Sequence, residues 1–178
     1  MRHATPKMLK FLGYPNQICI LVNKLCCAIC ILLGLSLITI ITLEVFFRYV
    51  INSALSWPEE VAGFVFVWFS MLGAAICLFE GSHIKVTFFV TQLNQKVQYY
   101  LKNFIYILVI IFSYVLVDRG ISSLYIVSGQ VSPAAKINMV WEYVAVPITG
   151  IIFILYCIVS ILNNLLTGND SIREDLKS

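Results

Sequence analysis

Long uncharged apolar runs alternate with short polar segments along the whole chain. The runs cover residues 25–43, 61–79, 103–117 and 143–168. A helix that crosses about 30 Å of hydrocarbon at about 1.5 Å per residue needs roughly 20 mostly apolar residues. The third run reaches this length when the mixed segment 118–127 continues it. The pattern predicts an all-α integral membrane protein, one domain over 1–178, with spans at 24–48, 57–79, 101–126 and 139–166.

The charged residues predict the orientation of these spans. The chain has 12 Lys and Arg residues, and all but Arg48, Arg119 and Lys136 lie in the two terminal segments or between the second and third spans. The positive-inside rule therefore puts the N- and C-termini and the middle segment in the cytoplasm. No basic stripe is interleaved with exposed aromatic residues, so we attribute the excess of basic residues to membrane topology. The expected partner is membrane lipid and not nucleic acid.

The middle segment has its own amphipathic character. Gly81 ends the second run, and the following residues 83–90 carry apolar side chains on a short basic stretch. This composition predicts an interfacial helix or elbow at the cytoplasmic surface, with His83 and Lys85 at the lipid headgroups. We interpret His83 as an interface residue and not as a ligand, since no other ligand type is near it in sequence.

The residue inventory offers little for chemistry. Cys27 and Cys30 form a C-x-x-C pair, but such redox or metal pairs sit at turns or helix N-termini, whereas this one lies inside an apolar run. We therefore expect packing residues, no disulfide and no metal site. The sequence shows no phosphate-binding loop and no Ser/His/Asp or Cys/His arrangement, so we expect no catalytic residues, no cofactor and no enzymatic activity.

One carboxylate lies within a predicted span. Glu44 and Arg48 are four residues apart, so they share a helix face and favour a structural ion pair. An ionisable residue in a span is also a functional candidate by default. The alternative is that Glu44 is the transport carboxylate of a small ion-coupled transporter that works by itself as a homodimer.

The connection before the second span contains a helix-start pattern. Ser56 and Glu59 have the S-x-x-E spacing of a capping box, and Pro58 suits a first helical turn. Trp57 is typical of a membrane interface. Glu60 is not needed by the cap and remains available for a partner. We expect this segment to be periplasmic and to be a candidate docking surface.

Small residues recur at helical spacing along the second span. They are Gly63, Ser70, Gly73 and Ala74. In lipid, small side chains let helix backbones approach closely, so the stripe predicts a helix-packing face.

Several short motifs occur in a fixed order along the chain. They are Arg48-Tyr49-Val50-Ile51-Asn52, Trp57-Pro58-Glu59-Glu60, Leu72-Gly73-Ala74-Ala75, His83-Ile84-Lys85-Val86, Ser132-Pro133-Ala134 and Trp141-Glu142-Tyr143-Val144-Ala145-Val146-Pro147. Together they closely resemble the small membrane subunit of the tripartite ATP-independent periplasmic (TRAP) transporters, the DctQ-like subunits. The resemblance runs from about residue 44 to residue 150 and touches all four spans.

This resemblance implies a function and a set of partners. DctQ-like subunits pair in the bacterial inner membrane with a much larger many-span subunit, and a soluble periplasmic protein delivers an organic acid, often a dicarboxylate or sialic acid. The chain is then expected to be a non-catalytic scaffold and docking subunit of a secondary active transporter, in which uptake is coupled to an ion. The alternatives are the homodimeric transporter around Glu44 and a membrane anchor without a transport role.

Overall fold

The computed structural model describes residues 6–53, 55–80 and 95–175. The expected interfacial helix, with His83 and Lys85, lies outside the described residues and stays a prediction. Five helices are described: α1 Pro6–Tyr49, α2 Pro58–Phe79, α4 Gln95–Val127, α5 Val140–Tyr143 and α6 Ala145–Asp175. Four helical stretches are long and apolar enough to cross a membrane. The predicted all-α fold with four spans is therefore confirmed.

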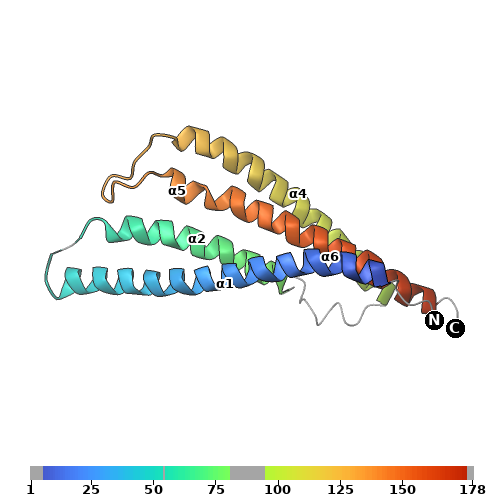
Figure 1. The fold of residues 1–178 in the computed structure, drawn as a ribbon. Helices are drawn as coiled ribbons and strands as arrows, with labels where there is room; N and C mark the ends of the chain where they lie inside the picture. The colour runs from blue at the N-terminus through green and yellow to red at the C-terminus, as the bar shows by residue number, and fades with distance from the viewer. Residues whose placement is uncertain (1–5, 54, 81–94, 176–178) are drawn as a thin grey trace.

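The helices form two antiparallel pairs. α1 packs along α2, and α4 packs along α6, while contacts between α2 and α6 join the pairs. Figure 1 shows that the pairs converge where both termini lie and diverge toward the opposite end. We call the end with the connections 50–57 and 128–139 the loop end, and the end with the termini the terminal end. Which end faces the cytoplasm stays a prediction from the charges.

α1 is longer than a bilayer requires. At about 1.5 Å per residue its 44 residues extend over about 66 Å. The distance from Lys24 to Glu44 is about 30 Å on the same scale, which equals the usual thickness of the hydrocarbon core. The part of α1 between these two charged residues is therefore about as long as the hydrocarbon core is thick, and α1 continues before Lys24 toward the terminal end. The span bounds themselves stay a prediction.

The buried core is small and lies toward the terminal end. Its members come from α1, α2 and α6: Cys19, Ala75, Leu78, Phe153, Tyr156 and Cys157. Two hydrogen bonds between amide side chains also join helices: Asn163 donates to Asn16 at 2.9 Å, and Asn164 donates to Asn103 at 3.3 Å. These bonds tie α6 to α1 and to α4. Most other large apolar side chains face outward, as expected where lipid and not water is the solvent.

Two glycines allow α4 and α6 to approach closely. A Cβ added to Gly120 would lie 2.8 Å from Cδ of Pro147, and one added to Gly150 would lie 2.8 Å from Cγ2 of Val117. One glycine comes from each helix, so each backbone fits against the other. Pro147 also explains why α5 and α6 are separate elements. Proline has no N–H to donate, so the helical hydrogen bond to the carbonyl of Tyr143 cannot form there.

Candidate functional site at the loop end

Glu60 lies in the first turn of α2 and binds the connection between α4 and α5. Its carboxylate accepts a hydrogen bond from Ser132 Oγ at 2.6 Å. The backbone N–H groups of Ala134 and Ala135 donate to the same carboxylate oxygen at 3.0 and 2.8 Å. We call this group, Glu60 with residues 132–135, the Glu60 clamp. It joins segments 72 residues apart in sequence.

The connection is shaped to present these donors. Val131 and Asn138 form an isolated antiparallel bridge, and Ser132 N–H donates to Ile137 C=O at 2.9 Å. The chain reverses between them with Lys136 at a φ of 56°. Because the loop is tight, the N–H groups of Ala134 and Ala135 have no partner in a regular helix or sheet, and the carboxylate satisfies both. Charge-assisted bonds of this kind are stronger than neutral ones.

A second contact fixes the same two parts of the chain. Trp68 of α2 donates from its indole Nε1 to the carbonyl of Trp141 in α5 at 2.8 Å. The Glu60 carboxylate also benefits from the positive end of the α2 dipole. The Glu60 clamp and the Trp68 contact together hold the loop end of the second helix pair against the first.

The predicted capping box is wrong. The structure starts α2 at Pro58 with Trp57 as the N-cap residue, and no side chain makes a cap hydrogen bond there. Ser56 and Glu59 therefore lie one residue too early for the required N-cap and N3 positions. The expectation that Glu60 is available for a partner is also wrong, because its carboxylate is bound within the chain. Pro58 does occupy the first helical turn, as predicted.

Glu44 and Arg48 face each other at the loop end of α1. Arg48 Nη2 donates to Glu44 Oε1 at 2.6 Å, with the Glu44 side chain 16% exposed. This carboxylate already has a charged partner on its own helix. Within the described ranges, no three His, Cys, Asp or Glu side chains lie close enough to hold a metal ion, and the six cysteines are all free thiols.

Most of the stripe of small residues on α2 does not pack within the described part of this chain. An added Cβ at Gly63 or Gly73 would have no atom within 4 Å, and Ser70 is exposed. Only Ala74 packs against the core. The sequence predicted a helix-packing face without naming its partner, and for these three residues the described part of this chain does not supply one, because α1 and α6 contact other sides of α2. The packing face therefore stays a prediction.

Sequence reasoning missed the residues that join distant segments. Ser132 belonged to one of the recognised motifs, but its partner was not predicted. Gly120 was not singled out, because a lone glycine in an apolar run does not reveal its neighbours. Asn16 and Asn163 carried a weak signal, since amide side chains in or near spans commonly bond to other helices.

The fold and its polar groups define a class of protein. It is a small multi-pass helical membrane protein whose hydrogen-bonded polar groups between helices lie mainly near its two ends. The sequence profile of the family described as the DctQ component of tripartite ATP-independent periplasmic transporters matches residues 37–167. This is more than half of the chain, and the chain belongs to that family. It is a multi-pass protein of the bacterial inner membrane and a transporter component.

Individual relatives agree with this assignment. The chain is 24% identical over 136 residues to the sialic acid TRAP transporter permease protein SiaT of Haemophilus influenzae strain 86-028NP, covering 76% of this chain and 22% of that protein. It is 27% identical over 131 residues to a TRAP transporter small permease protein of H. influenzae strain Rd, covering 74% and 81%. The sialic acid TRAP transporter small permease protein SiaQ of Vibrio cholerae is 31% identical over 61 residues, covering 34% and 35%.

Proposed function

We propose that this chain is the non-catalytic small subunit of an ion-coupled transporter for an organic acid of the sialic acid or dicarboxylate type. In this role it scaffolds a large translocating subunit and helps a periplasmic substrate-binding protein to dock. The observation that carries the proposal is the family match over residues 37–167. The chain spans about a fifth of the length of SiaT, covering 22% of it, which supports a role as one part of a larger transporter.

The state of Glu44 favours a scaffold over a self-sufficient transporter. A transport carboxylate usually lies near the midplane of the bilayer beside a broken helix. Glu44 instead lies near the loop end of an unbroken helix and is paired with Arg48 at 2.6 Å. Separating this pair during each transport cycle would leave a charge without its partner, which is costly in a membrane.

The loop end supports a role in docking. Trp57 and Trp141 are 40% and 67% exposed, and Glu59 is exposed at the start of α2. The Glu60 clamp holds the segments that carry these side chains, so Glu60 acts by positioning and not by touching a partner. Exposed aromatic residues are enriched at protein interfaces, and rim carboxylates attract basic partners over a distance. We infer that Trp57 and Glu59 lie in the docking surface.

The exposed small residues of α2 support a contact with the large subunit. Gly63, Ser70 and Gly73 lie on one side of the helix and leave space around their backbones. Another membrane helix can approach closely at such positions. The packing face predicted from the sequence would then lie between two proteins.

Reconstitution tests the proposal directly. The purified chain in liposomes should accumulate neither sialic acid nor a dicarboxylate under a sodium or proton gradient. Uptake should require a large many-span subunit and the soluble binding protein as well. In the complete system, a Glu44→Gln variant should retain most of the uptake. Arg48→Gln removes the other charge of the Glu44–Arg48 ion pair and is the matched variant. Solute accumulation by the lone chain, abolished by Glu44→Gln, would establish the homodimeric transporter and overturn the scaffold.

A further inference from the structure

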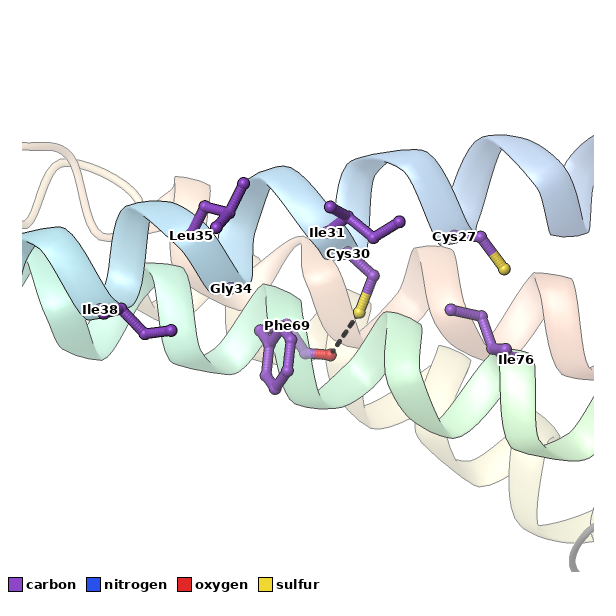
Figure 2. Close-up of a pocket in the computed structure, with 8 residues that line it drawn as sticks. All are labelled: Cys27, Cys30, Ile31, Gly34, Leu35, Ile38, Phe69 and Ile76. Carbon is purple, nitrogen blue, oxygen red and sulfur yellow. Dashed lines mark hydrogen bonds between the residues drawn. The ribbon is translucent and has the colours of Figure 1, made fainter.

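An apolar groove of about 460 Å³ runs between α1 and α2. On α1 its lining extends from Cys27 to Ile38, and on α2 it includes Phe69 and Ile76. Figure 2 shows Cys30 pointing from α1 toward α2, with Ile38 and Ile76 near the space between the two helices. The groove is open on its outer side, because Ile31, Leu35 and Ile38 are 65%, 60% and 66% exposed.

The walls of the groove offer apolar contact and almost no free polar group. Cys30 Sγ donates to the carbonyl of Phe69 at 3.6 Å, as the dashed line in Figure 2 marks, so this thiol has a partner. Gly34 leaves room for the aromatic ring, since a Cβ there would lie 3.2 Å from Cε2 of Phe69. An occupant of the groove must therefore be apolar along this length.

The dimensions of the groove fit one leaflet of a bilayer. From Cys27 to Ile38 the axis of α1 rises about 16 Å at about 1.5 Å per residue, and half of the hydrocarbon core is about 15 Å. The groove begins about 4.5 Å, or three residues, beyond Lys24, where the sequence predicts the start of the first span. Its length along α1 matches that of an acyl chain whose headgroup lies at the level of Lys24.

Each helix carries one charged residue about one turn beyond the terminal end of the groove lining. Lys24 is one turn before Cys27 on α1, and Glu80 is one turn after Ile76 on α2, so each shares the face of its helix that lines the groove. Both residues are exposed. A phosphate suits the lysine and a primary ammonium suits the glutamate.

We propose that this groove binds one acyl chain of an amine-bearing phospholipid from the leaflet at the terminal end. The lipid phosphate pairs with Lys24 and its ammonium group with Glu80. The site makes no use of the docking surface or of the Glu44–Arg48 pair, so it is independent of the proposed transport role.

Photo-crosslinking tests the position of the acyl chain. The full chain is placed in nanodiscs with a phosphatidylethanolamine that carries a diazirine in one acyl chain, and the labelled residues are found by mass spectrometry. Labelling should concentrate between Ile31 and Ile38. Leu35→Trp, which fills an exposed position in the groove, should reduce it several-fold. Uniform labelling of the outward faces of α1 and α4 would show ordinary surrounding lipid only and overturn the proposal.

Headgroup variants test the charges. Lys24→Gln should reduce labelling about fivefold, equivalent to about 1 kcal/mol for one lysine at a lipid surface. Lys102→Gln is the matched control, because Lys102 is an exposed lysine on α4. Glu80→Gln should abolish the preference for phosphatidylethanolamine over phosphatidylglycerol. Equal effects of Lys24→Gln and Lys102→Gln on labelling would refute the site. Loss of groove labelling only when the large subunit is present would also refute it, because a helix of that subunit would then be the occupant.

Discussion

The close approach of α4 and α6 makes Gly150 the most informative position for a stability test. We consider Gly150→Ala, which adds one methyl group where the structure leaves no room. The new Cβ would meet Cγ2 of Val117 at 2.8 Å and the carbonyl oxygen of Ser113 at 3.1 Å. The valine can rotate away, but the carbonyl belongs to the α4 backbone and moves only if the helices separate.

Two effects of opposite sign set the magnitude. Alanine is about 1 kcal/mol more favourable than glycine inside a helix. Overpacking a tight site costs about 1–3 kcal/mol. For Gly150→Ala the steric effect dominates because one contact is with backbone, so the free energy of unfolding should fall by up to about 2 kcal/mol. Gly73→Ala is the control: its Cβ meets nothing within 4 Å, so only the favourable helix effect remains.

The free energy of unfolding can be measured by titrating the protein in mild detergent with sodium dodecyl sulfate and following its circular dichroism. The labelling rate of Cys157 gives a second readout, because this thiol is fully buried on the same helix as Gly150 and reacts only when the packing opens. Gly150→Ala should raise that rate and Gly73→Ala should not. If Gly150→Ala were as stable as the wild type while Gly73→Ala was destabilised, the close contact between α4 and α6 would be refuted.

Two further predictions concern the loop end and the topology. Glu59→Gln should slow association with the periplasmic binding protein, more at low salt than at high salt, because salt screens the field of charges at the rim of an interface. Stopped-flow fluorescence measures the association rate. Glu80→Gln, at the other end of α2, should leave this rate unchanged. A membrane-impermeant maleimide should label Val131→Cys from the periplasm and Val97→Cys only from inside, and the reverse pattern would invert the orientation predicted from the basic residues.

The sequence by itself determined the features that depend on local spacing. The four spans follow from the length of the apolar runs, and the Glu44–Arg48 contact follows from a separation of four residues on one helix. Pro58 at the start of α2 likewise follows from its own backbone chemistry. The capping box failed although its spacing was right, because the helix begins one residue later than Ser56 requires.

Only the tertiary structure decided which distant groups meet. Glu60 binds residues 132–135, Gly120 lies against Pro147, and the groove between α1 and α2 forms from two helices. The sequence suggested packing at Gly63 and Gly73, yet the tight contacts occur at Gly120 and Gly150. The reason is physical: side chains that face lipid are as apolar as those that face another helix, so hydropathy does not mark which side of a span is buried.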